Sequence, residues 1–339
     1  MKHLFLVLLM NTLMVYAKGQ IAGGVLHLNG VSDYADSFGT FDALTDSSDF
    51  TIELWFRKCN ATPASFNLFD YKASTAGDGI DAFYSDFLGA IQVTFSGETG
   101  FQNTVYMNVP LSQEEVNNGQ WKHFAITFDD DSGIARAFIN GVFVLEEDSV
   151  SFVPTTGSFV LGANDLGYLW PFAGEIDEVR TSNVIRYGSN FIPENVPFEV
   201  DNHTLGLWHF DEAEGTNVFH DEVDQFAFIG NSNTTTFHLI EADNISICPG
   251  NSVLLDAHSN LLSYSWTPST GLSATDIANP NSTPGNSITY LLTANNGMCD
   301  YEDSIHINVG NLQASINGNA TICAGDTTEL SACCGTTYS

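Results

Sequence analysis

Three acidic residues that could support hydrolysis lie in the stretch EIDEVR, from Glu175 to Arg180. Retaining hydrolysis of a glycosidic bond uses two carboxyl groups about 5 Å apart. Side chains alternate between the faces of a strand, so a strand here places Glu175 and Asp177 on one face and Glu178 on the other. The next position on the first face holds Val179, which is not an acid. We therefore predict that this stretch is not catalytic, and that Asp177 and Arg180 hold a strand end or a turn in place.

The other reactive residue types form no recognisable catalytic or metal-binding pattern. The sequence contains no Gly-x-Ser-x-Gly elbow, no phosphate-binding loop and no Gly-x-Gly-x-x-Gly fingerprint. His203, His209 and His220 are close in sequence but not at the spacing of ligands on a helix. The six cysteines include no Cys-x-x-Cys pair, which disfavours zinc. We predict no catalytic residue and no enzyme activity in this chain.

The chain is strongly acidic. Its 339 residues include 9 Lys and Arg against 41 Asp and Glu, a formal net charge of −32. Such a surface repels phosphate backbones and anionic membranes, so we expect neither a nucleic acid nor a membrane as partner. Most of these acids serve solubility, although carboxylate oxygens are also the ligands that Ca²⁺ prefers.

The elements that must position any site are short β-strands. Within 119–145, the residues Phe124, Ile126 and Phe128 share one face of a predicted strand. The pair Asn140-Gly141 predicts a type I′ hairpin turn, because both residues tolerate positive φ. Similar runs recur along the chain without long helical periodicity, which predicts an all-β protein.

Several blocks resemble laminin-G-like domains, which are jelly rolls of the concanavalin A-like lectin and glucanase superfamily. Motifs of that family are matched, in the family's order, at residues 29–34, 50–55, 121–123, 138–141 and 172–180. The last block has the pattern Phe-x-Gly-x-Ile-Asp-Glu-Val-Arg and is the most specific match. The resemblance implies a jelly-roll β-sandwich over residues 22–230.

The same resemblance implies a calcium ion. Laminin-G-like domains often bind one Ca²⁺ through Asp or Asn side chains and backbone carbonyls. The candidate ligands within the matched motifs are Asn29, Asp33 and Asp177, although Asp33 has the alternative role of shaping a turn. After Asp221 the sequence lacks the Gly-rich loop usual in the family, which puts an ion site at that point in doubt.

Aromatic residues in stretches that look like loops are candidate ligand contacts. Tyr84, Tyr168 and Trp170 are such residues, and an exposed ring can stack on the face of a sugar. The alternative is that they pack within the rim of the domain. The Gly- and Asp-rich stretch 73–86 is predicted to be a loop on the ligand-facing side.

Residues 241–310 follow a predicted linker at 231–240 and resemble the PKD-like, immunoglobulin-like repeats of bacterial surface proteins. Residues 311–339 repeat the opening of that domain, with Cys323 following Cys248 by 75 residues. We therefore expect a small β-sandwich and the truncated start of a second one. The whole chain is predicted to be all-β, with a concanavalin-like jelly roll followed by these immunoglobulin-like units.

The cysteines suit an exported protein. Cys248 and Cys299 bracket the first repeat, and we predict a disulfide bond between them. Cys59 has no partner within its own domain, and the pairing of the three cysteines after residue 320 stays open.

Residues 1–17 resemble a secretory signal peptide, with a positive start, an apolar core and small residues before a cut near Lys18. The apolar run is too short to span a bilayer. We predict a secreted, cell-surface-associated protein that binds an extracellular glycan or surface protein, with the repeats as a stalk. The alternatives are an accessory region of a larger glycoside hydrolase or peptidase, and a purely structural cap.

Overall fold

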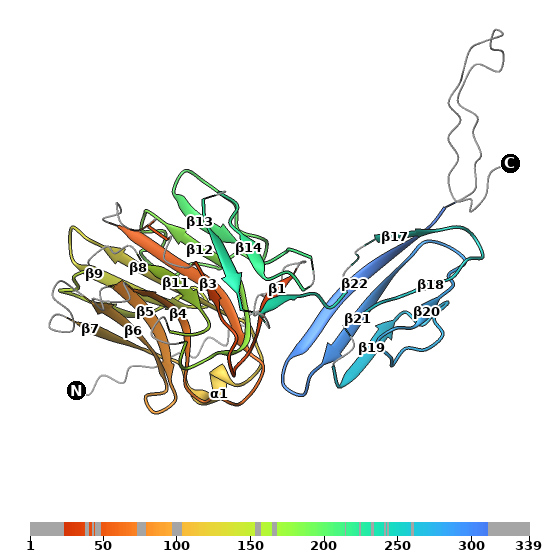
Figure 1. The fold of residues 1–339 in the computed structure, drawn as a ribbon, viewed down its shortest axis with the longest axis horizontal. Coiled ribbons are helices and arrows are strands. Elements are labelled where there is room, and N and C mark those ends of the chain that lie inside the picture. The colour runs from red at the N-terminus through yellow and green to blue at the C-terminus, as the bar shows by residue number, and fades with distance from the viewer. Residues whose placement is uncertain are drawn as a thin grey trace, which may run out of the picture.

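The computed structural model describes residues 24–37, 41–42, 44, 49–72, 79–96, 104–152, 157–164, 168–213, 215–223, 225–231, 234–240, 242, 244–258 and 261–310. The predicted signal peptide and the predicted second repeat lie outside these residues. Strands make up a large two-layered body and a smaller one beside it (Figure 1). The one helix among the described residues is the single turn α1 (Gln113–Val116). The prediction of an all-β fold is confirmed.

The first sheet of the large body has eight antiparallel strands in the order β10-β9-β8-β3-β12-β1-β16, with β13 paired to β12. Its strands are β1 (Val25–Asn29), β3 (Phe50–Lys58), β8 (Lys122–Asp129), β9 (Ile134–Ile139), β10 (Val142–Glu147), β12 (Ala173–Ser182), β13 (Thr204–Trp208) and β16 (Thr235–Phe237).

The second sheet also has eight antiparallel strands, in the order β14-β15-β2-β11-β4-β5-β6-β7. Its strands are β2 (Ala35–Asp36), β4 (Phe66–Lys72), β5 (Gly79–Ser85), β6 (Ala90–Ser96), β7 (Val105–Pro110), β11 (Ser158–Leu161), β14 (Val218–His220) and β15 (Ala227–Gly230).

The core of the large body lies between these two sheets. Phe124, Ile126 and Phe128 of β8 all point into it and are at most 1% exposed, as their alternation predicts. The predicted hairpin turn is also present, because Asn140 has φ 51° and Gly141 has φ 72°. The large body is thus the jelly-roll sandwich that the sequence indicates.

The smaller body is a second β-sandwich. A four-stranded sheet in the order β17-β22-β21-β19 faces a two-stranded sheet of β18 and β20. These strands are β17 (Asn244–Ile247), β18 (Val253–Leu254), β19 (Ser263–Thr267), β20 (Asn281–Ser282), β21 (Ile288–Asn295) and β22 (Asp300–Val309). Trp266, Tyr290 and Ile305 are buried in its core.

Two segments expected to be irregular form strands instead. Residues 235–237 of the expected linker are strand β16, which pairs with β1 at the edge of the first sheet. Residues 79–85 of the expected loop are strand β5, which lies between β4 and β6. The Gly, Asp, Asn and Thr residues of these segments led to the prediction of a linker and a loop. Both segments form strands because neighbouring strands pair with them.

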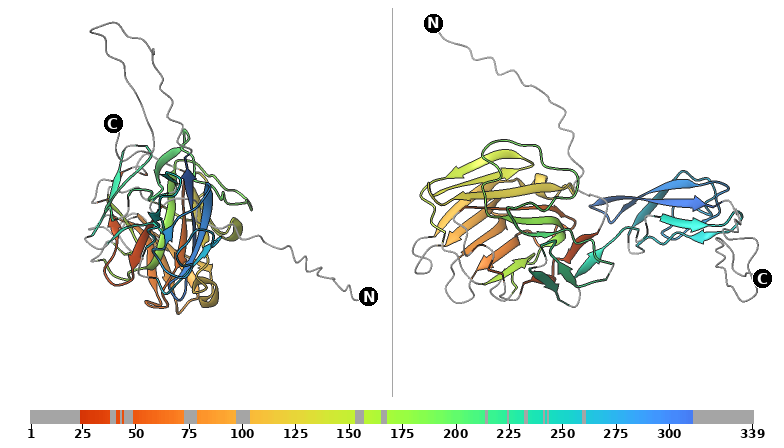
Figure 2. Two further views of the ribbon diagram at one scale, coloured as in Figure 1. Left: turned by 90° about the vertical axis from the view of Figure 1, so that its right-hand side faces the viewer. Right: turned by 90° about the horizontal axis from the view of Figure 1, so that it is seen from above.

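The disulfide prediction is wrong. Cys299 bonds to Cys59, 240 residues away in sequence, and not to Cys248. The physical reason is the position of Cys299 in the hairpin between β21 and β22, which packs against the large body. The bond therefore connects the two bodies, which lie end to end (Figure 2).

Arg57 of β3 is central to the contact between the two bodies. Its Nε donates to Glu175 Oε2 at 2.6 Å, and its Nη1 donates to the carbonyl of Asp300 at 2.7 Å. Its guanidinium lies 4.8 Å from the ring centre of Trp121 and 4.6 Å from that of Tyr301. These contacts bind β3 to the hairpin that carries Cys299.

Peptide mapping under non-reducing conditions tests the pairing. We expect one linked pair of peptides that contains Cys59 and Cys299, and a Cys248–Cys299 pair would contradict the structure. Cys59→Ser should lower the free energy of unfolding by about 2–4 kcal/mol, because the bond closes a long loop. The double variant Cys59→Ser with Cys299→Ser is the control and should lose about the same amount, since both variants lack the same bond.

Candidate functional site

The outer face of the first sheet is covered. Residues 183–203 follow β12 and pass across this face, where Tyr187 and Phe191 stack with ring centres 3.5 Å apart. The ring of His123, which is 0% exposed, meets the edges of both rings and of Phe198. The strands beneath this segment are therefore shielded from a ligand.

Glu53 lies beneath this cover in a network of polar contacts. Its carboxylate accepts hydrogen bonds from Arg180 at 2.8 Å and from the Tyr187 hydroxyl at 2.8 Å, and His123 Nε2 lies 3.0 Å away. Burial alone would raise the pKa of Glu53, but the His123 hydrogen bond and the Arg180 charge outweigh it and lower the pKa. The fully buried, fully paired carboxylate holds the cover on the sheet.

The acids of the EIDEVR stretch are engaged in internal contacts. Glu175 is paired with Arg57, while Glu178 accepts from the Phe198 N–H at 2.7 Å and lies 2.7 Å from His209 Nδ1. A bulge between Asp177 and Arg180, with Glu178 at φ 52°, sets their directions. These contacts hold β12 to its neighbours.

The three predicted calcium ligands do not share one site. Asn29 and Asp33 are together, because Asp33 Oδ2 accepts from the Asn29 N–H at 3.0 Å. Asn29 is paired with Ala173, however, and Asp177 lies four residues further along β12, roughly 13 Å away at about 3.3 Å per residue. The carboxylate of Asp177 accepts from the Glu178 N–H, and burial together with the charges of Glu178 and Asp211 raises its pKa well above the usual value.

Part of the oxygen donors at Asn29 and Asp33 is already used within the protein. The Asn29 side-chain oxygen already accepts two backbone N–H groups. Of the two Asp33 carboxylate oxygens, Oδ2 accepts the Asn29 N–H and Oδ1 is buried without a hydrogen bond. Within the described part of the chain, no three His, Cys, Asp or Glu side chains gather as a metal would require. Calcium binding stays a prediction.

The three predicted aromatic contacts have different environments. Tyr84 is 0% exposed and stacks on Phe66 in the core, so its prediction as a ligand contact is wrong. Tyr168 stacks on Tyr34 with ring centres 3.7 Å apart, and its hydroxyl donates to Asp36 at 2.9 Å. Its ring thus packs within the rim, which is the alternative that the sequence left open.

Trp170 is the predicted aromatic residue that is exposed. Its side chain is 49% exposed and meets the Phe83 ring edge-on at 5.4 Å. Its carbonyl accepts from the Asn67 N–H at 2.9 Å, which holds the loop before β12 against β4. A large ring is thereby presented beside the outer face of the second sheet.

The strand register places amides in line with Phe83. Residues paired directly across an antiparallel sheet share a face. Phe83 is paired with Gln92, and Gln92 with Asn108, whose side chains are hydrogen-bonded at 3.0 Å. We call Asn67, Phe83, Gln92 and Asn108, together with Trp170, the aromatic–amide row.

A second row of polar residues runs parallel to it on the same face. Asp81 lies between the core residues Ile80 and Ala82, so its side chain points outward. The paired positions along this row are Asp36, Val160, Asp70, Asp81, Thr94 and Tyr106. The carboxylates are buried, whereas Tyr106 is 52% exposed. In this row, Tyr106 therefore offers an exposed hydroxyl to a ligand, whereas the buried carboxylates do not.

Sequence reasoning missed most of this face. Phe83, Gln92 and Asn108 come from three strands, and only the register brings them together. Alternation in 80–84 was a usable signal, because Ile80, Ala82 and Tyr84 face the core and leave Phe83 outside.

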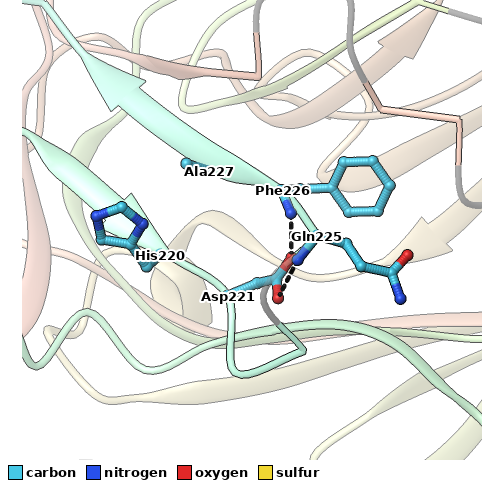
Figure 3. Close-up of a pocket in the computed structure, with 5 residues that line it drawn as sticks. All are labelled: His220, Asp221, Gln225, Phe226 and Ala227. Carbon is cyan, nitrogen blue, oxygen red and sulfur yellow. Dashed lines mark hydrogen bonds between the residues drawn. The ribbon is translucent and has the colours of Figure 1, made fainter.

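A shallow hollow of about 240 Å³ is lined by His220, Asp221, Gln225, Phe226 and Ala227 (Figure 3). The Asp221 carboxylate accepts the backbone N–H groups of Val223 at 2.6 Å, Gln225 at 3.3 Å and Phe226 at 2.6 Å. The Asp221 carboxylate therefore fixes the backbone of this loop through hydrogen bonds.

The comparisons agree with this fold. Residues 29–186 match a family model described as the concanavalin A-like lectin/glucanases superfamily. This part of the chain therefore has a concanavalin A-like jelly-roll fold. No curated protein matches the chain. The described residues include no helix that has both the length and the apolar character for crossing a bilayer.

Three solved structures illustrate the likeness. A Bacteroides ovatus ATCC 8483 protein described as carbohydrate-binding is 19% identical with a TM-score of 0.43, covering 63% of this chain, which in turn spans 59% of its length. A SAP-like pentraxin from Limulus polyphemus is 12% identical, covering 63% of this chain and 98% of its own, with a TM-score of 0.40. The CBM40 module of the Ruminococcus gnavus IT-sialidase, bound to α2,3 sialyllactose, is 14% identical, covering 50% of this chain and 95% of its own, with a TM-score of 0.39. No ligand is assigned to this chain from them.

The Glu175–Arg57 pair makes stability depend on pH. Burial alone would raise the pKa of Glu175, but the Arg57 guanidinium and the His27 hydrogen bond outweigh it and lower the pKa from 4.5 to about 2. A depressed carboxyl pKa stabilises the fold above about pH 4.5, and this contribution disappears as the pH falls towards 2. We expect about 3 kcal/mol of unfolding free energy to be lost across this window.

Chemical unfolding of the wild type and Glu175→Gln between pH 2 and pH 6 measures this contribution. The variant should be less stable at pH 6 and should lose less stability on acidification. Glu146→Gln is the matched control, because Glu146 forms an exposed ion pair with Arg136 and should contribute at most about 1 kcal/mol. Equal pH slopes for the wild type and Glu175→Gln would contradict the assignment.

Proposed function

We propose that the jelly roll is a non-catalytic module that binds glycans on the outer face of its second sheet. The observation that carries the proposal is the half-exposed Trp170 ring, held against Phe83, with the amides of Gln92 and Asn108 on the next two strands. The superfamily description of residues 29–186, which names lectins and glucanases, supports the same class of ligand.

The aromatic–amide row offers complementary contacts to a sugar. The Trp170 ring provides an apolar platform for the C–H face of a pyranose. Further along the row, the amides of Gln92 and Asn108 can donate to and accept from the hydroxyls of a sugar chain that starts at Trp170. The face runs across several strands, so a chain of sugars can extend along it.

The opposite face supports the same choice of surface. Residues 183–203 cover the outer side of the first sheet, and its charged groups are paired with one another. A ligand there would have to displace buried ion pairs, which is costly.

We also propose that the protein acts outside the cell, with the smaller sandwich as part of a PKD-like stalk. The Cys59–Cys299 bond supports export, because disulfides persist in oxidising compartments. The same bond and the Arg57 contacts would hold the jelly roll at a constant orientation on that stalk.

Glycan-array screening followed by calorimetry on the best glycan tests the binding face. Trp170→Ala should weaken binding roughly tenfold or more, about 1.4 kcal/mol, because the stacking platform is removed. Phe143→Ala is the matched control, since Phe143 is an aromatic residue of 40% exposure on the edge strand β10 of the first sheet. Its removal should leave affinity unchanged.

Two outcomes would count against the proposal. Wild-type protein that binds no glycan on the array would remove the ligand class. Equal affinities of Trp170→Ala and the wild type would move the site away from this face.

A further inference from the structure

A separate hollow lies where the two sandwiches meet. Its volume is about 330 Å³, and both bodies contribute to its lining. The large body supplies His27 of β1 and Phe237 of β16, and the smaller body supplies His258, Asn296 and Tyr301. Domain boundaries are frequent positions for small-ligand sites, because they combine apolar walls with polar groups from two directions.

Phe237 is the apolar centre of this hollow. The ring of His258 lies 4.6 Å from its centre, Tyr301 5.3 Å and His27 5.8 Å. Both imidazole rings line the hollow with Phe237, so it combines an aromatic surface with polar side chains. This arrangement suits a molecule with an apolar face and a polar edge.

A polar side chain lines the hollow beside Phe237. His27 Nδ1 lies 3.5 Å from Glu175 Oε1, its ion-pair partner, which fixes the position of the imidazole ring. The Glu175 side chain is fully buried, whereas that of His27 is 42% exposed and lines the hollow. The imidazole can therefore form a hydrogen bond with a hydroxyl of a molecule in the hollow.

Further polar groups are held in place on the other wall. Asn296 Oδ1 accepts from the N–H groups of Met298 and Cys299, and Asn296 Nδ2 donates to the Tyr301 hydroxyl at 3.1 Å. These contacts place the Asn296 amide and the Tyr301 hydroxyl in the hairpin that the disulfide attaches to the large body. A wall held in this way loses little freedom when a ligand binds.

We propose that this junction hollow is a second binding site, for a single sugar ring. The C–H face of the ring would lie against Phe237, and its hydroxyls would bond His27 and the Asn296–Tyr301 wall. The volume lies at the lower end of the range of about 300–1,000 Å³ found for small-molecule pockets, which suits one ring better than a chain. The site is distinct from the outer face of the second sheet and does not depend on glycan binding there.

Saturation-transfer NMR on the full chain tests the site, with the methyl glycosides of glucose, galactose and mannose as probes. Thr235, paired with His27, also lines the hollow, so Thr235→Trp should fill it. We expect transfer to at least one glycoside in the wild type, and at least roughly fivefold weaker binding in Thr235→Trp. Thr267→Trp in β19 is the matched control, and it should bind as the wild type does.

The remaining outcomes separate this site from the outer face. Transfer that persists in Thr235→Trp but disappears in Trp170→Ala would overturn the junction site and leave the outer face as the sugar site. No transfer to any of the glycosides in the wild type would overturn the assignment of a sugar ring. Circular dichroism and disulfide mapping of each variant confirm that the fold and the Cys59–Cys299 bond are intact, so that a lost signal reports on binding.

Discussion

The pairing of β3 with β12 is the constraint on which the rest of the structure depends. Its inward side chains, such as Phe56 and Ile176, build the core between the sheets. Its outward side chains include charges, because Glu53 is paired with Arg180 and Arg57 with Glu175. Charged groups are tolerated away from water only when paired and hydrogen-bonded. Residues 183–203 cover the Glu53–Arg180 pair, and the smaller sandwich covers the Arg57–Glu175 pair.

This arrangement gives the two outer faces different roles. The first sheet uses its outer face to hold the molecule together, through the Glu53 network and the Arg57 contacts. The second sheet carries the aromatic–amide row on its outer face, with Trp170 and Tyr106 about half exposed. The outer face of the first sheet is therefore used for internal packing. The proposed glycan site lies on the face that this choice leaves accessible.

The junction between the sandwiches is built from the same residues. Arg57 contacts the backbone of Asp300 and the ring of Tyr301, and Cys59 is bonded to Cys299 one residue before Asp300. Gly119, at φ 70°, packs against the carbonyl of Met298, where a side chain would collide with it. A disulfide, a hydrogen bond, a cation–π contact and close backbone packing thus meet at one hairpin of the smaller body. The hollow proposed to bind a sugar ring lies beside this hairpin and owes its second wall to it.

The sequence by itself determined the all-β class, the inward face of β8, the Asn140-Gly141 hairpin and the jelly-roll motifs. These are local properties, because alternation and turn chemistry depend on neighbouring residues. Only the tertiary structure decided what depends on distant partners. It placed Tyr84 in the core, separated Asp177 from Asn29, made β16 from an expected linker, and paired Cys299 with Cys59. The aromatic–amide row belongs to this second group, because its residues come from several strands and the sheet register alone brings them together.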